Sequence, residues 1–401
     1  MKLKKYILFT LIIISLFTNV YGFYDEINEN NDTYVIETSV QGRKEVPRLN
    51  ARAAILYDST YGRILYEKNA YSQRANASTT KMITAIVAYE NGNLEDNVTV
   101  GKNAAIVGGS GINLRTNDVI TLDDLIKGLL IRSGNDAAVA IAEHISGSVQ
   151  DFTKLMNEKV SEIGARNTNF VNPHGLDADN HYSTAYDLML IAEYLLNIPY
   201  LADIVSKRQA EIKINGDTRF INTTNEVLGY YQGANGVKTG YTGNAGRCII
   251  NSAVRDGRRL VCVVLGCDTK KDRTEDAIKL LDYGYTSYEI VNLQEYVREQ
   301  FCISVDKSEY ETYVIKTKIN AFYPLRKEER DRLEVKYYIH NNLVAPLKKG
   351  TSVLEIQILL DSQCINTFDV TLSEDIYRKN WKTYFNNLVD KTLQFSIDSI
   401  F

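Results

Sequence analysis

The sequence contains few of the residues that bind metal ions, and it has no excess of positive charge. Its 401 residues include four histidines and five cysteines, and neither an H-E-x-x-H nor a C-x-x-C pattern occurs. Because zinc sites are built mainly from such His and Cys spacings, the sequence offers almost no ligands for zinc chemistry. The formal net charge is -4, which gives no electrostatic reason to expect binding to nucleic acid. We therefore expect no metal ion, no other cofactor and no nucleic-acid partner.

The apolar run at the N-terminus is too short to span a membrane. Lys2, Lys4 and Lys5 precede an apolar run over residues 6–17, and Val20-Tyr21-Gly22 then offers a cleavage site. A spanning helix needs about 20 apolar residues, whereas a secretory signal peptide has this shorter pattern. We interpret residues 1–22 as a signal peptide rather than an uncleaved anchor, and we predict that the protein acts outside the cytoplasm.

The five cysteines are too few and too scattered for the disulfide framework of a small exported domain. Cys248 and Cys262 flank the turn Asp256-Gly257, which has the composition of a two-residue hairpin turn. In such a hairpin Cys262 faces Asn251 rather than Cys248. We expect Cys248 and Cys262 to be small buried apolar residues.

The composition and the hydrophobic periodicity of the chain predict two domains. Residues 23–46 are polar and acidic and predict a linker, and residues 47–295 carry both helical and strand periodicity. β-Prone runs at 53–57 and 63–66 predict a hairpin, and Asp256-Gly257 joins further strands within 237–266. Apolar residues at helical spacing predict helices over 78–89, 122–131, 136–145, about 150–163 and 184–197. Thr184 and Asp187 form a capping pair for the helix at 184–197.

The pattern of apolar and charged residues changes after residue 300. Short β-prone runs separated by charged turns predict a second, all-β domain over 300–375. From residue 376 onward, aromatic and aliphatic residues repeat every three to four positions, and residues 376–393 hold four basic side chains and one acidic one. This pattern predicts an amphipathic helix over 376–401. Such a helix suits an anionic membrane surface, and its alternative is that the apolar face packs on the β domain.

Three short motifs bear residues that can perform acyl transfer. They are Ser78-Thr79-Thr80-Lys81, Ser133-Gly134-Asn135 and Lys238-Thr239-Gly240. On a helix, residues three apart lie on one face, so the Lys81 amine can reach the Ser78 hydroxyl and act as its base. Each motif alone is more often a surface turn, a helix-ending loop or a strand end. Together, in this order and on an exported chain, the three motifs indicate an active site.

With these motifs the sequence resembles a low-molecular-mass penicillin-binding protein, a serine-type D-alanyl-D-alanine carboxypeptidase. The resemblance also rests on Asn172-Pro173-His174-Gly175-Leu176, on His181-Tyr182-Ser183-Thr184-Ala185 and on Tyr241-Thr242 after the third motif. It is strong over about 47–290, although Asn76 stands where the family usually has proline. It implies an α/β (α+β) transpeptidase and β-lactamase-like fold, with helices around an antiparallel sheet, followed by a small all-β domain.

The resemblance also implies the catalytic roles. Ser78 would attack the carbonyl between two D-alanines of a peptidoglycan stem peptide and hold the remaining peptide as an ester. Lys81 would take the Ser78 proton, and Ser133 would pass a proton to the departing D-alanine nitrogen. β-Lactams would act as inhibitors. The location would be the outer face of the cytoplasmic membrane, held there by the C-terminal helix.

The remaining motif residues would bind the substrate. Asn135 would hold the peptide amide and Lys81, while Lys238 and Thr239 would bind the terminal carboxylate. Gly240 removes a side chain where the substrate backbone would pass. The backbone N–H of Tyr241 would complete an oxyanion hole with that of Ser78.

Several alternatives remain open from the sequence. His174 and His181 could suggest a Ser-His-Asp triad, but we interpret them as structural because Lys81 already supplies a base. A β-lactamase would need a deacylating Glu in an E-x-x-L-N segment, and the string at 193–197 falls inside a predicted helix, so we interpret Glu193 as a coincidence. A transpeptidase or endopeptidase would use the same motifs. A catalytically inactive wall-binding protein would not need them.

Overall fold

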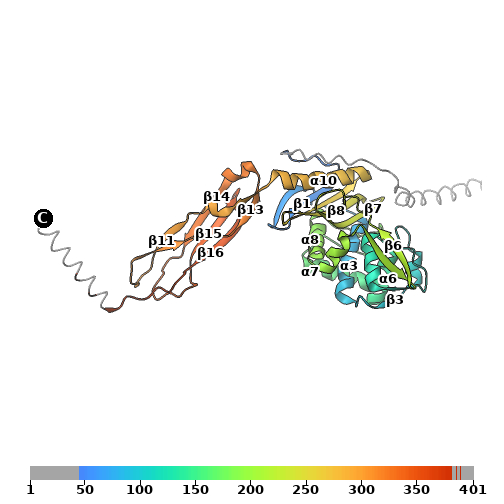
Figure 1. Cartoon of the computed structure of the whole chain (residues 1–401), viewed down its shortest axis with the longest axis horizontal. Coiled ribbons are helices and arrows are strands. Elements are labelled where there is room, and N and C mark those ends of the chain that lie inside the picture. Colours follow the sequence, from blue (N-terminus) through green and yellow to red (C-terminus); the bar gives the residue numbers. More distant parts are fainter. Residues whose placement is uncertain (1–44, 382–384, 386–388, 390–401) are drawn as a thin grey trace, which may run out of the picture. The chain divides into compact units, whose positions relative to one another are not determined.

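The computed structural model describes residues 45–381 together with Phe385 and Val389. The predicted signal peptide and most of the predicted linker lie outside the described residues. The chain divides into two units between Ser287 and Tyr288, which is before the predicted boundary at 295–300. Figure 1 shows the elements of both units, and each unit is considered separately below.

A five-stranded antiparallel sheet lies at the centre of the first unit, in the order β2-β1-β9-β8-β7. Figure 1 shows helix α10 (Lys270–Ser287) on one side of this sheet and the other helices on the opposite side. Because both faces are covered, β8 and β9 are buried along most of their length. The strands are β1 (Ala53–Asp58), β2 (Arg63–Lys68), β7 (Ala234–Thr242), β8 (Gly246–Arg255) and β9 (Arg258–Cys267).

Both predicted hairpins are confirmed. β1 pairs with β2, and β8 pairs with β9 through the turn at Asp256 and Gly257. Both turn residues have positive φ, at 50° and 77°, as a type I′ turn requires. Asn251 faces Cys262 as predicted, and Cys248 and Cys262 are buried free thiols.

The helices pack below the sheet around a continuous apolar core. The five predicted helices are present, and Thr184 Oγ1 accepts a 3.0 Å hydrogen bond from the backbone N–H of Asp187, which confirms the predicted cap. The sequence did not predict the small sheet β3-β4-β5-β6 at the edge of this region. The helices are η2 (Ala77–Thr80), α3 (Lys81–Asn91), α4 (Lys102–Ile106), α5 (Leu122–Ile131), α6 (Asn135–Ser146), α7 (Val149–Ile163), α8 (Ala185–Leu196) and α9 (Pro199–Ser206). The strands of the small sheet are β3 (Asn97–Thr99), β4 (Val119–Thr121), β5 (Gln209–Ile214) and β6 (Asp217–Asn222).

The second unit is built from strands, as predicted. Its sheets pair β10 with β13, β11 with β12, and β14-β15-β16 in chain order. Alternate side chains of β15 pack into an apolar core, and this core belongs to the second unit. The elements are β10 (Glu289–Asn292), η3 (Leu293–Tyr296), β11 (Gln300–Ser304), β12 (Thr312–Lys316), β13 (Phe322–Leu325), η4 (Lys327–Arg332), β14 (Leu333–Ile339), β15 (Ser352–Leu360) and β16 (Gln363–Thr371).

The prediction that the C-terminal helix begins at Ile376 is wrong. Ile376 and Leu347 exchange two backbone hydrogen bonds of 2.8 and 2.9 Å, and Arg378 pairs with Ser308. Residues 376–380 are therefore extended and belong to the edge of the β unit. Trp381, Phe385 and Val389 are helical and exposed, and the other residues of the predicted helix after 381 lie outside the described part of the chain.

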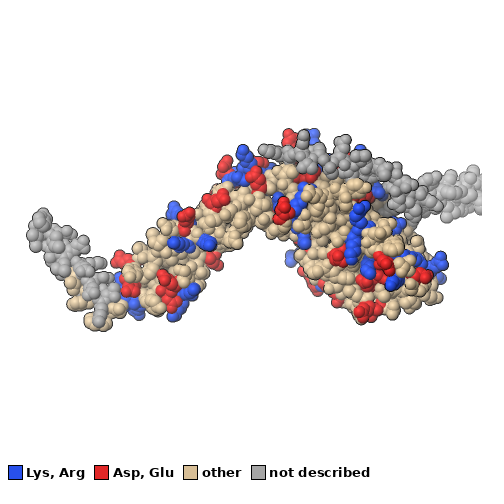
Figure 2. All heavy atoms as spheres, in the orientation of Figure 1, with Lys and Arg blue, Asp and Glu red and all other residues tan. Residues whose placement is uncertain are grey.

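Figure 2 shows basic and acidic side chains interspersed on the visible face of each unit. Among the described helices, none is by itself long and apolar enough to cross a membrane. α8 and α9 pass that test only as a pair, with a bend of 105° between them.

Candidate active site

Ser78 and Lys81 lie in direct contact where two helical segments join. Ser78 is in the 3₁₀ turn η2, and Lys81 is the first residue of α3. Lys81 Nζ lies 2.7 Å from Ser78 Oγ, and the Lys81 side chain is fully buried. Ala77 holds a positive φ of 49°, a backbone conformation that costs free energy outside glycine and that clusters at functional sites. The contact predicted from the S-x-x-K spacing is thus present.

Asn135 brings the second motif to the same amine. Asn135 is the first residue of α6, and its Oδ1 accepts a 2.6 Å hydrogen bond from Lys81 Nζ. The Asn135 amide donates in turn to the backbone oxygen of Gly108 at 2.6 Å. Hydrogen bonds from a charged donor are stronger than neutral ones, so this pair fixes the position of the Lys81 amine.

Ser133 is held in the loop between α5 and α6. Its φ is +67° and the residue is buried. The carboxylate of Asp136 orders the facing loop by accepting hydrogen bonds of 3.0 to 3.1 Å from the backbone N–H groups of Ile112 and Leu114. The loop of the second motif is therefore fixed from its far side by residues 108–114.

The third motif lies on β7, which runs against η2. A Cβ atom on Gly240 would lie 2.8 Å from the Ser78 nitrogen and 3.0 Å from the Ala77 Cβ, so only glycine permits this approach. Lys238 is buried, and its Nζ donates to the backbone oxygen of Thr239 at 2.8 Å. The Thr239 hydroxyl lies 2.7 Å from that of Thr224. The structure thus brings all three motifs to one place.

Tyr241 follows Gly240 at the end of the motif. The Arg247 guanidinium lies 3.7 Å from the centre of the Tyr241 ring, a cation–π contact that holds the ring. The Thr242 hydroxyl donates to Asp177 Oδ1 at 2.7 Å. These contacts fix the strand end that carries the backbone N–H expected in the oxyanion hole.

His174 and His181 do not form a triad with Ser78. His181 Nδ1 accepts a hydrogen bond from the backbone N–H of Val171, and its Nε2 lies 2.9 Å from Thr80 Oγ1. Burial lowers the pKa of His174 to about 3 and that of His181 to about 4, and the positive charge of Lys81 contributes to both shifts. Both imidazoles are therefore neutral near pH 7, and they support the loop as expected from the sequence.

Several contacts at this site were not predicted from the sequence. The backbone oxygen of His174 accepts a 2.7 Å hydrogen bond from Lys81 Nζ. A Cβ on Gly175, which has a φ of +88°, would lie 1.9 Å from the backbone oxygen of Ala77. Asn76 Nδ2 donates to the hydroxyls of Thr79 and Thr80 at 3.0 and 2.9 Å. The glycine at position 175 and the short polar side chain of Asn76 are the signals in the sequence that bear on these contacts.

Glu193 lies in α8, away from the three motifs. Its Oε2 accepts a 2.5 Å hydrogen bond from Ser59 Oγ, and burial raises the pKa of its carboxyl group. The position inside a regular helix agrees with the prediction. Across residues 45–381, no group of three His, Cys, Asp or Glu side chains is placed to hold a metal ion.

Comparison with known families gives a consistent result for both units. Residues 40–269 match the family described as D-alanyl-D-alanine carboxypeptidase. Residues 301–378 match the C-terminal domain of penicillin-binding protein 5. The two matches fall on the two units of the structure.

Similar proteins include D-alanyl-D-alanine carboxypeptidase DacF of Bacillus subtilis, which is 34% identical over 86% of this chain and 90% of the relative. D-alanyl-D-alanine carboxypeptidase DacA of Escherichia coli is 31% identical over 90% of each chain. Among solved structures, D-alanyl-D-alanine carboxypeptidase DacD of Francisella tularensis is 27% identical. It has a TM-score of 0.67 and covers 88% of this chain and 99% of its own. The predicted fold is confirmed, and the chain belongs to the D-alanyl-D-alanine carboxypeptidase family of penicillin-binding proteins.

Proposed function

We propose that this chain removes the terminal D-alanine from peptidoglycan stem peptides through an ester on Ser78. The observation that supports this most directly is the contact of Lys81 Nζ with Ser78 Oγ and Asn135 Oδ1, at 2.7 and 2.6 Å. Because burial disfavours the charged form of an amine, the fully buried Lys81 gives up a proton more easily than an exposed lysine. Lys81 is thus a suitable base for the Ser78 hydroxyl.

In the first step, Ser78 Oγ attacks the carbonyl carbon between the two D-alanines and Lys81 takes its proton. The negative charge on the carbonyl oxygen is stabilised by the backbone N–H groups of Ser78 and Tyr241, each worth about 3 kcal/mol in comparable sites. The close approach of Gly240 to the Ser78 nitrogen supports this pairing. The carbon–nitrogen bond then breaks as Ser133 gives its hydroxyl proton to the departing nitrogen and receives the proton that Lys81 took from Ser78, which leaves Lys81 deprotonated for the second step.

Recognition of the free C-terminus comes from β7. Lys238 and the Thr239 hydroxyl bind the terminal carboxylate, and Asn135 binds the amide of the peptide that stays on the enzyme. In the second step, water attacks the Ser78 ester and Lys81 accepts the proton of that water. The bond to Ser78 Oγ breaks as Lys81 returns this proton to Oγ, and the shortened peptide leaves with a free carboxyl group. No cofactor enters either step.

The site should hydrolyse the ester between a β-lactam and Ser78 only slowly. β-Lactams would therefore remain bound to Ser78 and act as inhibitors. A deacylating glutamate like that of a β-lactamase is not supplied by Glu193, which hydrogen-bonds to Ser59. An endopeptidase or transpeptidase would use the same groups with a different leaving group or acceptor. The predicted signal peptide and the basic, aromatic C-terminal segment support action in the cell-wall space, at the outer face of the cytoplasmic membrane.

The test is D-alanine release from a pentapeptide ending in D-Ala-D-Ala, together with labelling by a fluorescent penicillin. Release should be readily measured, and the label should attach to Ser78 and persist. The Ser78→Ala protein should show neither, while Ser161→Ala, at an exposed serine of α7, should behave like the unsubstituted protein. Labelling that survives in Ser78→Ala would disprove the assignment of the nucleophile.

A further inference from the structure

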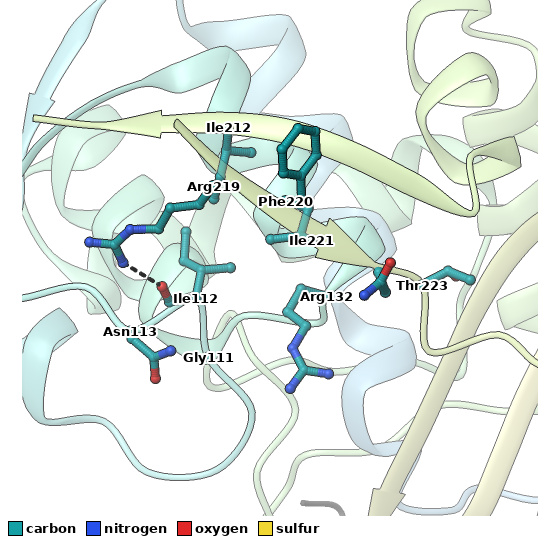
Figure 3. A pocket seen from close by; sticks show the side chains of 10 residues that line it. Gly111, Ile112, Asn113, Arg132, Ile212, Arg219, Phe220, Ile221 and Thr223 are labelled. Carbon is teal, nitrogen blue, oxygen red and sulfur yellow. Dashed lines mark hydrogen bonds between the residues drawn. The ribbon is translucent and has the colours of Figure 1, made fainter. Parts of the chain in front are cut away.

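A cavity of about 580 Å³ lies beside the second motif, and its volume is in the range of small-molecule sites. It is enclosed by β5, β6, the loop at 111–113 and Arg132 (Figure 3). Two of its lining side chains are arginines and none is acidic. The lining residues are Gly111, Ile112, Asn113, Arg132, Ile212, Arg219, Phe220, Ile221, Asn222 and Thr223.

The two arginines carry charge that their surroundings do not neutralise. Within the described chain, the Arg132 guanidinium makes no hydrogen bond or ion pair. Arg219 Nη1 donates only to the backbone oxygen of Ile112, at a long 3.5 Å. The nearby Asp136 carboxylate is occupied by the backbone N–H groups of residues 112 and 114. Figure 3 shows both guanidinium groups on the same side of β6, with Ile112 between them.

The cavity adjoins the part of the active site that handles the leaving group. Arg132 directly precedes Ser133, which we propose as the proton donor to the departing nitrogen. Thr223 directly precedes Thr224, whose hydroxyl lies 2.7 Å from that of Thr239. The backbone N–H of Thr224 also donates to the oxygen of Ile131 at 3.2 Å, which joins the two walls. Two lining residues of the cavity, Arg132 and Thr223, are therefore each one residue away from a group at the leaving-group side of the site.

We propose that Arg132 and Arg219 form a second anion subsite for a leaving group larger than D-alanine. This inference rests on the proposed function and extends it to cross-linked stem peptides. In such a cross-link the leaving group is a D-amino acid whose side chain continues into a neighbouring stem. D-Alanine, with one methyl group, has nothing that could reach this cavity.

The fitting ligand is a carboxylate carried on the side chain of the leaving amino acid, as in a diamino diacid. Arginine binds carboxylates with two parallel hydrogen bonds, and an uncompensated pair favours an anion over a neutral group. The chemistry is the same hydrolysis. The carbon–nitrogen bond breaks, the amine leaves with the proton from Ser133, and water later cleaves the Ser78 ester.

Three synthetic substrates test the subsite, all with diacetyl-L-lysyl-D-alanine as the acyl part. The first has D-alanine as leaving group. The second has meso-diaminopimelate joined through the amine of its D-centre, with its distal carboxylate free, and the third has that carboxylate amidated. The unsubstituted enzyme should cleave the second with a kcat/KM at least about tenfold above the third, because hydrogen bonds between two charged groups are stronger than those to a neutral amide.

The variants Arg132→Gln and Arg219→Gln, and above all the double variant, should bring the ratio of kcat/KM between the second and third substrates close to one. Arg166→Gln, at an exposed arginine of the same unit, should keep the ratio of the unsubstituted enzyme. Equal cleavage of the second and third substrates by the unsubstituted enzyme would overturn the subsite, whatever the variants do. If the unsubstituted enzyme releases no D-alanine from the first substrate, the result overturns the proposed function instead.

Discussion

Asn135 Oδ1 lies 2.6 Å from Lys81 Nζ, which ties the first residue of α6 to the first residue of α3. The two residues are 54 positions apart in the chain. Since Lys81 Nζ also contacts Ser78 Oγ, the amide of Asn135 sets the distance between base and nucleophile. Asn135 thus contacts the nucleophile through Lys81.

Replacing Asn135 with alanine should slow acylation of Ser78 by about ten- to a hundredfold. The change removes a hydrogen bond from a charged donor, worth about 1.5 to 3 kcal/mol, and leaves the buried amine less well positioned. The measurement is the rate of labelling by a fluorescent penicillin, with the melting temperature recorded in parallel. Asn167→Ala, at an exposed position, serves as the control and should label normally. Labelling of Asn135→Ala at the normal rate would show that Lys81 is positioned without this amide.

Replacing Gly240 with alanine should reduce acylation by about a hundredfold or more, because loss of one oxyanion donor costs that much in comparable sites. The added Cβ would lie 2.8 Å from the Ser78 nitrogen, so β7 or η2 must shift. Gly243→Ala is a close control, since a Cβ there meets nothing within 4 Å. The two variants are compared by kcat/KM for D-alanine release. Equal activities would mean that the approach of β7 to η2 is not needed.

Acid should destabilise the first unit between about pH 6.5 and pH 4. The folded state lowers the pKa of His181 to about 4 and that of His174 to about 3, so the unfolded chain binds more protons in this range. The stability from the neutral imidazoles is complete above the unfolded pKa of about 6.5 and is lost as the pH falls through the folded values.

The check is the melting temperature from pH 7 to pH 4 for the unsubstituted protein and for His181→Gln. The variant should be less stable at pH 7 but should lose less on acidification, because one titrating group is gone. His340→Gln, at an exposed histidine of the second unit, is the control. An acid-induced loss of the same size in His181→Gln would exclude His181 as its source.

Two truncations separate the β unit from the segment proposed to bind the membrane. A chain that ends at Asn380 keeps the backbone pairs of Ile376 with Leu347 and of Arg378 with Ser308. It should move from the membrane pellet to the soluble fraction with full D-alanine release. A chain that ends at Asp375 loses both pairs and should melt at a lower temperature. If the chain ending at Asn380 stays in the pellet, the anchor lies elsewhere.

Local features of the fold could be predicted because they depend on neighbours in the sequence. The S-x-x-K contact, the cap of α8 by Thr184 and the hairpin turn at Asp256 and Gly257 each involve residues a few positions apart. In these cases spacing alone decides which side chains meet. The motifs also predicted Asn135 and Lys238 as site residues, and the structure places Asn135 Oδ1 against Lys81 Nζ.

Other contacts depend on the complete tertiary fold and left no local pattern. The backbone oxygen of His174 reaches Lys81 across 93 positions, and any residue type would supply that oxygen. The helix predicted from Ile376 was wrong because backbone pairing with Leu347 outweighs a helical apolar period. In the sheet β3-β4-β5-β6, strands β3 and β4 are three residues long, which is too short to show a period.

The assembly of the site from distant segments makes penicillin a reporter of folding. Ser78 meets its base within one turn, but that base is held by Asn135 and by His174, and β7 arrives from beyond residue 234. In a chain that is still being exported or is partly unfolded, Ser78 therefore lacks these neighbours and has the reactivity of an ordinary serine. Only molecules in which η2, α6, the loop at 172–176 and β7 have closed together should take the label. The labelled fraction after export would then equal the fraction of enzyme molecules that are folded, even in a mixture with misfolded chains of the same mass.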